Sequence, residues 1–361
     1  MQNVERPKGP DRSICWESPC KTLLLDYREV EHAKGASPRI PIASVRHKGR
    51  KDLEVEYSRR NSYVATALPP GVMCVLPTPF TDDGRVDMVS LSRLANYAID
   101  QGATALVCFG LASEGFKLSD KERAESLATV LETVGNRVPL IAGSENNSVE
   151  TAAARTEDYV EAGVSAVMTM PPSFVKPNAK ELKEYYKQVA IAASGLPVII
   201  QDAPGWTGVD LPVELIRELR DSAQNITAVK IENPPNHRKI ADLRALGFVC
   251  VGGYGGLHLL EDVDAGITSV MYGAGSLHAM VDLWQTLGID QELAWEKFQR
   301  LLPLLTFQMS SLDVFVAVQK QLLKQAGVID STRHREPGQP LTDHQVNWLA
   351  SLIRRWEKSL P

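Results

Sequence analysis

The chain has 361 residues, and its formal net charge at neutral pH is −5. Its composition is that of an ordinary globular protein, and the mildly negative charge offers no basic surface for nucleic acid or anionic lipid. No apolar stretch approaches the roughly 18 residues that a membrane-spanning helix requires. We therefore expect no nucleic-acid partner and no membrane span, and we expect the protein to act on a small molecule.

The five cysteines and seven histidines are scattered along the chain. Cys74, Cys108 and Cys250 fall inside short apolar runs, where reduced cysteine packs as a small hydrophobic residue. No pair of cysteines has zinc-ligand spacing together with a second pair or with histidines. We therefore expect no metal ion, no other cofactor and no structural disulfide. A cytoplasmic location follows as an expectation, because thiols stay reduced there.

Residues 1–69 differ in composition from the rest of the chain. They hold 13 Lys and Arg against 9 Asp and Glu, so this segment is positively charged within an acidic protein. It is rich in Pro, Lys and Arg and has no sustained apolar period. This pattern predicts an irregular or disordered N-terminal extension of unknown role.

From residue 71 onward, eight short apolar runs alternate with longer amphipathic stretches. Capping signals at Ser119 and Asn178 begin two of the predicted helices. The repeats predict an α/β fold, a (β/α)8 TIM barrel over residues 70–286, with a C-terminal helical region over 287–361. A doubly wound sheet is the alternative, but no Gly-x-Gly-x-x-Gly turn follows the first strand. The apolar runs are Gly71–Leu76, Thr104–Phe109, Val138–Gly143, Ser165–Met170, Pro197–Gln201, Ile226–Lys230, Phe248–Gly252 and Ile267–Tyr272.

Lys230 is the only charged residue in the sixth apolar run and stands at its end. Burying a lysine is costly, and burial favours the neutral amine, which can attack a carbonyl carbon and form a Schiff base. Glu232 lies two residues further on, so its side chain points to the same side of the strand. The pattern makes Lys230 a candidate nucleophile, although a strand-end lysine reaching into solvent would give the same local sequence.

Three other predicted strands also end in positions suited to a site, because the active site of a TIM barrel lies at the carboxyl ends of its strands. The turn after the second strand could bind a carboxylate with free backbone N–H groups, or it could be a plain strand-to-helix turn. The fifth strand ends in a polar pair. The seventh ends in glycines, which could let a ligand approach the backbone or could form a loop without a partner. The candidate residues at these ends are Gly110, Leu111, Ala112, Ser113, Gln201, Gly252 and Gly253.

An ordered series of motifs resembles the dihydrodipicolinate synthase and N-acetylneuraminate lyase family over about residues 70–300. The series runs from Pro77–Phe80 through the Gly110–Glu114 turn, Ile141–Gly143 and Pro171–Pro172 to the lysine of the sixth strand. The resemblance implies a (β/α)8 enzyme in which Lys230 forms a Schiff base with pyruvate or another 2-oxo acid. It also implies a homotetramer, a dimer of dimers, in which Phe174 approaches the neighbouring subunit, and it makes Phe174 a candidate substrate-binding residue.

The chain departs from the family pattern at several positions. Leu111 and Ala112 stand where the family usually has two threonines, and Gln201 stands where it has a catalytic tyrosine. Trp206 replaces the arginine that would bind the carboxylate of an aspartate semialdehyde, and Phe174 lies where the family has a tyrosine. These changes argue against dihydrodipicolinate synthase activity itself.

The missing tyrosine leaves Glu232 as the nearest candidate for acid and base catalysis. A carboxylate two residues after the Schiff-base lysine resembles the sugar-acid dehydratases of the family, in particular those acting on 2-keto-3-deoxy-L-arabonate. The expected function is a Schiff-base lyase that dehydrates such an acid, with Lys230, Glu232 and Gln201 as catalytic residues. A pyruvate-releasing aldolase and a non-catalytic barrel that binds a 2-oxo acid are the alternatives.

Overall fold

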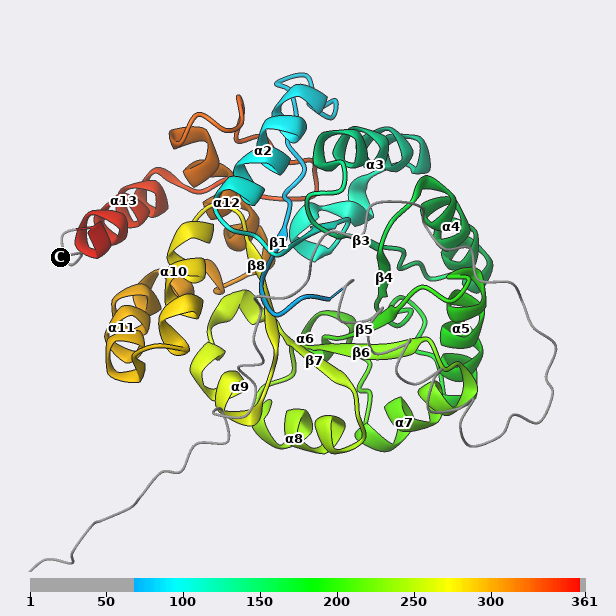
Figure 1. The fold of residues 1–361 in the computed structure, drawn as a ribbon. Helices are drawn as coiled ribbons and strands as arrows, with labels where there is room; N and C mark the ends of the chain where they lie inside the picture. Colours follow the sequence, from blue (N-terminus) through cyan, green and yellow to red (C-terminus); the bar gives the residue numbers. More distant parts are fainter. Residues whose placement is uncertain (1–67, 358–361) are drawn as a thin grey trace, which may run out of the picture. The chain divides into compact units, whose positions relative to one another are not determined.

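The computed structural model describes residues 68–357. Its eight parallel strands close into a barrel in sequence order (Figure 1), which confirms the predicted (β/α)8 architecture. Each strand begins and ends within two residues of its predicted run. The strands are β1 (Gly71–Val75), β2 (Ala105–Cys108), β3 (Leu140–Gly143), β4 (Ala166–Thr169), β5 (Val198–Asp202), β6 (Ile226–Ile231), β7 (Val249–Gly252) and β8 (Ser269–Gly273).

Helices surround the barrel and connect successive strands (Figure 1). The two predicted capping boxes are confirmed, since Ser119 pairs with Glu122 and Asn178 pairs with Glu181 at the helix starts. The helices are α2 (Met88–Asp100), α3 (Asp120–Val134), α4 (Val149–Ala162), α5 (Ala179–Ala192), α6 (Pro204–Thr207), α7 (Val213–Ser222), α8 (His237–Ala245), α9 (Leu259–Ala265) and α10 (Leu277–Leu287). Short 3-10 turns, η2 (Leu111–Ser113), η3 (Gly115–Lys117) and η4 (Tyr254–Gly256), follow β2 and β7.

From residue 287 onward the described chain contains helices and no strand, as the sequence predicts. It forms α11 (Gln291–Gln308), α12 (Leu312–Gln325) and α13 (Asp343–Glu357). In the part of the chain that the structure describes, no single helix is long and apolar enough to cross a membrane, and the pair α11 and α12, bent by 119°, meets those criteria only when taken together.

The barrel interior is filled by every second residue of the strands, because side chains alternate between the two faces of a strand. Ala228 of β6 and Ile199 of β5 belong to this interior cluster. Lys230 and Gln201 follow them at an interval of two, so their side chains also point inward, at the carboxyl end of the barrel. Leu68 packs in the same cluster, so the packed structure includes the last two residues of the segment predicted as an extension. The rest of that extension lies outside the described residues.

The three cysteines within the described residues are buried and unpaired. Burial raises the pKa of the Cys108 and Cys250 thiols to about 12, which keeps them protonated and unreactive. They pack as small apolar side chains, as predicted. Cys15 and Cys20 lie outside the described residues.

One buried carboxylate lies between α8 and α9. Asp262 is 1% exposed and accepts a hydrogen bond from Asn236 Nδ2 at 3.0 Å. Desolvation raises the pKa of Asp262 to about 7, and the Asn236 hydrogen bond offsets only part of that effect. A carboxyl group whose pKa is higher in the folded than in the unfolded chain binds its proton more tightly when folded, so stability falls as pH rises from about 4 to 7.

We expect Asp262→Asn to raise the melting temperature by several degrees at pH 8 and to change it little at pH 4, because the amide keeps the size and removes the buried charge. Thermal unfolding at the two pH values, followed by circular dichroism, measures this difference. Asp264→Asn on the same helix is the matched control, since Asp264 is 71% exposed and should show no such pH dependence. A variant that is less stable than the parent at pH 8 would contradict the expectation.

Candidate functional site

A pocket of about 50 Å³ lies at the carboxyl ends of the strands and contains Lys230 and Glu232 in its wall. Its position is that of the active site in TIM-barrel enzymes. Within residues 68–357, no group of three or more His, Cys, Asp and Glu side chains is arranged to hold a metal ion. The other lining residues are Val75, Leu111, Ala112, Trp206, Gly255, Met271, Tyr272, Gly273, Met309, Ser311, Leu312 and Phe315.

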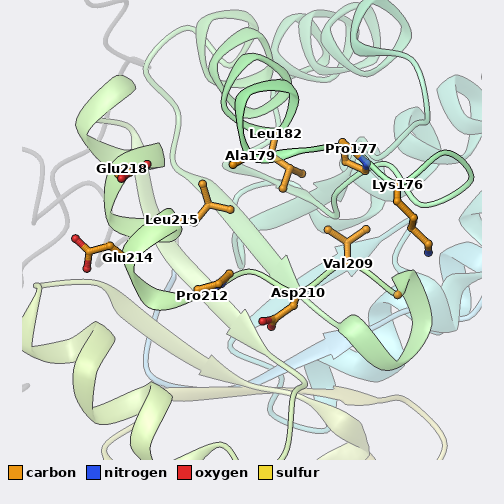
Figure 2. Close-up of a pocket in the computed structure, with 11 residues that line it drawn as sticks. Lys176, Pro177, Ala179, Leu182, Val209, Asp210, Pro212, Glu214, Leu215 and Glu218 are labelled. Carbon is orange, nitrogen blue, oxygen red and sulfur yellow. The ribbon is translucent and has the colours of Figure 1, made fainter.

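A wider hollow of about 500 Å³ lies between α5 and α7 (Figure 2). Lys176, Asp210 and Glu214 are among its lining residues, and all three are exposed. The Lys176 ammonium donates to the Thr207 carbonyl. The charged side chains of this hollow are thus exposed to solvent. The smaller pocket instead holds a buried lysine beside a buried carboxylate. A buried lysine and a buried carboxylate side by side in a cleft mark a functional site better than volume does.

Lys230 occupies the inward face of β6, in register with Gln201 of β5 and Val251 of β7. Its side chain is almost fully buried, and Nζ lies 3.2 Å from Glu232 Oε2. The strand period places both side chains on one side, as the sequence predicts. The buried lysine thus has a carboxylate within reach for proton transfer.

Three donors hold the Glu232 carboxylate in place. Gln201 Nε2 donates to Oε2 at 2.6 Å, and Lys230 contacts the same oxygen. The backbone N–H of Tyr254 donates to Oε1 at 2.9 Å. The structure therefore brings the three predicted catalytic residues together, and it adds Tyr254, whose contribution comes from its backbone.

The two glycines that end β7 lie in different environments. An added Cβ at Gly252 would meet Ile267 Cδ1 at 2.8 Å, so this glycine permits close packing on the helix side of the barrel and does not reach the pocket. An added Cβ at Gly253 would meet Glu232 Cγ at 2.5 Å. Gly253 therefore makes room for the Glu232 side chain, and neither glycine has the ligand-facing position expected from the sequence.

The turn after β2 is a 3-10 turn, η2, and only part of it reaches the pocket. The Ser113 N–H donates to the Gly110 carbonyl at 3.0 Å, so this amide is used within the turn. Ser113 itself is buried, and its carbonyl accepts from Thr78 Oγ1 at 2.5 Å. Leu111 and Ala112, whose N–H groups open the turn, line the pocket. Ser113 and Glu114 do not cap α3, because Ser119 does.

Phe174 lies on the loop between β4 and α5 and is 88% exposed. The N–H groups of Ser173 and Phe174 donate to Asn147 Oδ1 at 2.9 and 2.8 Å, which fixes the loop backbone. The described chain does not bring the Phe174 ring to its own pocket. Its expected approach to a neighbouring subunit remains a prediction.

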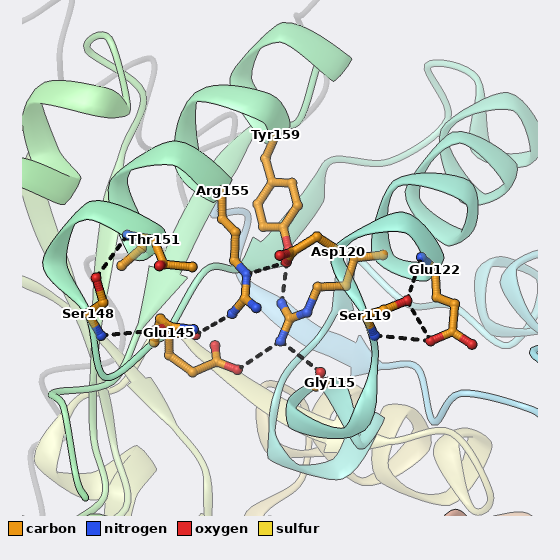
Figure 3. A network of polar contacts seen from close by, with 12 residues as sticks. Gly115, Ser119, Asp120, Glu122, Glu145, Ser148, Thr151, Arg155 and Tyr159 are labelled. Carbon is orange, nitrogen blue, oxygen red and sulfur yellow. Dashed lines mark hydrogen bonds and ion pairs between the residues drawn. The ribbon is translucent and has the colours of Figure 1, made fainter.

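A buried arginine supports the turns after β2 and β3. Figure 3 shows the polar network that contains its partners Gly115, Glu145 and Tyr159. Arg123 of α3 is 1% exposed and donates to the Gly115 carbonyl at 2.7 Å and to the Gly143 carbonyl at 3.0 Å. It also donates to Tyr159 Oη at 2.9 Å, and Glu145 lies 3.6 Å away. The sequence did not reveal this support, because an arginine on an amphipathic helix normally faces solvent.

The sequence also missed the apolar side of the pocket. Met309, Leu312 and Phe315 come from α12 and the segment before it, more than 75 residues after Lys230. The helical region was predicted only to pack on the barrel. Trp206, noted in the sequence as a replacement for arginine, lines the same pocket from α6.

The model of the dihydrodipicolinate synthetase family matches residues 68–355. The chain belongs to this family. It is 31% identical to L-2-keto-3-deoxyarabonate dehydratase of Azospirillum brasilense over 296 residues, which are 79% of this chain and 94% of the relative. It is 29% identical to a 4-hydroxy-tetrahydrodipicolinate synthase of Bartonella bacilliformis over 220 residues, 56% of this chain and 74% of the relative.

The crystal structure of dihydrodipicolinate synthase from Rhodopseudomonas palustris has the same fold, with a TM-score of 0.75 and 26% identity over 80% of this chain and 98% of that one. Family membership makes the protein a lyase that acts on a small molecule. The relatives are named both as a dehydratase and as synthases, so membership alone leaves the reaction open.

We expect Gly253→Ala to lower the turnover number of the enzyme by about 10-fold to 100-fold relative to the parent protein. The added methyl would overlap Glu232 Cγ and displace the carboxylate from Lys230. Steady-state kinetics with circular dichroism as a check of folding measures the effect. Gly288→Ala is the control, because the nearest atom to its added Cβ is 3.8 Å away. Unchanged turnover in Gly253→Ala would show that turnover does not depend on the position of the Glu232 carboxylate.

Proposed function

We propose that the protein dehydrates a 2-keto-3-deoxy sugar acid, such as 2-keto-3-deoxy-L-arabonate, through a Schiff base on Lys230. The observation that carries the proposal is the buried Glu232 carboxylate, 3.2 Å from Lys230 Nζ and held by Gln201 where the synthases have a tyrosine. The similarity to the Azospirillum dehydratase over most of both chains supports the same reaction.

Formation of the Schiff base uses the Lys230–Glu232 pair. Glu232 accepts a proton from the Lys230 ammonium, and the free amine attacks C2 of the 2-oxo acid. The protonated Glu232 then returns this proton to the hydroxyl of the carbinolamine, which leaves as water. The products of this stage are a cationic imine and an ionised Glu232.

Elimination follows from the cationic imine, which withdraws electrons from C2. Glu232 removes a proton from C3 and gives an enamine, and it then donates that proton to the C4 hydroxyl, which leaves as a second water molecule. Hydrolysis of the unsaturated imine releases the product and restores Lys230. One carboxylate suffices, since it is ionised before and after each stage.

The remaining pocket residues bind and orient the substrate in this proposal. The substrate carboxylate would lie on the N–H groups of Leu111 and Ala112, next to Gly110. Gln201 holds Glu232, because its amide cannot exchange a proton at neutral pH. Lys230 is the only basic residue that lines the described pocket, which suits a substrate with a single carboxylate. Assembly as a homotetramer, with Phe174 near a second subunit, and the cytoplasmic location remain predictions.

Retro-aldol cleavage from the same imine is the alternative reaction. It would need a base for the C4 hydroxyl proton, and Glu232 could serve there as well. Only the aldolase releases pyruvate, so a coupled lactate dehydrogenase assay with 2-keto-3-deoxy-L-arabonate separates the two. Oxidation of NADH in step with substrate loss would exclude the dehydratase.

We expect borohydride reduction in the presence of pyruvate to add one label per chain, on Lys230. Intact mass followed by peptide mapping locates it. Mapping is needed because Lys320 is also buried, and desolvation lowers the pKa of its ammonium to about 8. Lys320 does not line the pocket, so it should stay unlabelled. A label that persists in Lys230→Ala would contradict the Schiff-base proposal.

Glu232→Gln should form the Schiff base more slowly, with water taking over the proton transfers, and should lose turnover by about 100-fold to 10,000-fold, the range for removing a general acid or base. The amide keeps the size of the side chain and its contact with the Tyr254 N–H. Single-turnover experiments that follow imine formation and product release separately measure both steps. Turnover equal to that of the parent protein would remove Glu232 from the mechanism. Glu261→Gln is the control, since this carboxylate is 45% exposed on α9.

A further inference from the structure

A second buried lysine lies close to the pocket without lining it. Lys320 of α12 is fully buried, and its ammonium pairs with Glu114 Oε1. It also donates to the Arg333 carbonyl at 2.7 Å and lies 4.4 Å from the centre of the Phe80 ring. The mechanism proposed above does not use this group.

Glu114, the partner of Lys320, directly follows the pocket turn η2. It is 1% exposed, and its φ of 53° lies in the left-handed region, which is uncommon for a residue other than glycine. Its second oxygen accepts from Lys117 Nζ at 2.9 Å and from the Arg335 N–H at 3.3 Å. The carboxylate therefore joins the turn to α12 and to the segment after it.

Both elements joined by this ion pair contribute to the wall of the same pocket. Leu111 and Ala112 line it from η2, and Leu312 and Phe315 line it from α12. The pocket measures only about 50 Å³, so a small change in the distance between these elements changes its size substantially. Buried ion pairs contribute little net stability compared with well-packed apolar residues, so stability alone does not account for this one.

We propose that the buried Lys320–Glu114 ion pair is a positioning device that holds η2 and α12 at a fixed separation and thereby shapes the pocket around the substrate carboxylate. This inference rests on the proposed function, since it assigns the carboxylate to the N–H groups of Leu111 and Ala112. Lys230 of β6 and Glu232, which directly follows that strand, are not among the contacts of the pair. Loss of the pair should therefore weaken substrate binding more than it slows the chemical steps.

Three variants test the proposal: Glu114→Gln, Lys320→Met and the double variant. The double variant removes both charges of the pair, and Lys117, which loses Glu114 as a partner, still donates to the Arg335 carbonyl at 2.7 Å, so the double variant should fold even where Glu114→Gln alone does not. The concentration of pyruvate that gives half-maximal borohydride trapping at Lys230 should rise about 10-fold or more in each, with the maximal extent unchanged. The half-saturating pyruvate concentration of the double variant should be no higher than that of the more impaired single variant, because each single change already breaks the pair.

Leu323→Ala is the matched control. Leu323 is a fully buried residue of α12 in the apolar core, so its truncation weakens the docking of the helix without touching the ion pair. It should lower the melting temperature and keep the parent half-saturation for pyruvate. If Leu323→Ala raises the half-saturation as much as the double variant does, general loosening of α12 explains the result and the proposal fails.

Hydrogen exchange without ligand gives a readout that is independent of the reaction. Peptides covering residues 110–118 should exchange faster in the double variant than in the parent or in Leu323→Ala. Absence of trapping in the parent protein would refute the Schiff-base function, and the exchange data would still decide on the ion pair. Parent-like half-saturation and exchange in the double variant would overturn the positioning role.

Discussion

The candidate site depends on a buried carboxylate being held in one place. Burying the Glu232 carboxylate without partners would be costly. It instead forms an ion pair with Lys230 and accepts hydrogen bonds from the Gln201 amide and the Tyr254 N–H. These partners come from β5, from β6 and from η4 after β7. The barrel brings them together because the inward-facing residues of neighbouring strands lie side by side at the carboxyl end.

Much of this arrangement could be predicted from the sequence. Eight apolar runs at regular spacing give the barrel, and the period of two residues along β6 puts Lys230 and Glu232 on one face. Gln201 could be placed beside Lys230 because it stands at the end of β5, the strand that neighbours β6. These features are local, or follow from the order of the strands, so a sequence pattern is enough to expose them.

The remaining features depend on contacts between distant segments. Nothing in the pattern of residues 309–315 indicates that α12 and the segment before it line the pocket. Gly253 appeared as a position where a ligand could approach, yet the space it leaves belongs to Glu232. Arg123 and Lys320 have the sequence context of surface residues on amphipathic helices, and both are buried. Each case is decided by tertiary packing, for which the local pattern carries no signal.

The residues around Lys230 are best understood as one set. Gln201, at the position where the family resemblance implies a tyrosine, has no hydroxyl to exchange protons, but it donates a hydrogen bond to Glu232 Oε2. Gly253 leaves room for the Glu232 side chain, and the Tyr254 N–H binds its other oxygen. Under the proposed function, Glu232 alone carries out the proton transfers. Because Glu232 directly follows β6, which carries Lys230, a shift of that strand moves both side chains together and preserves the distance between them.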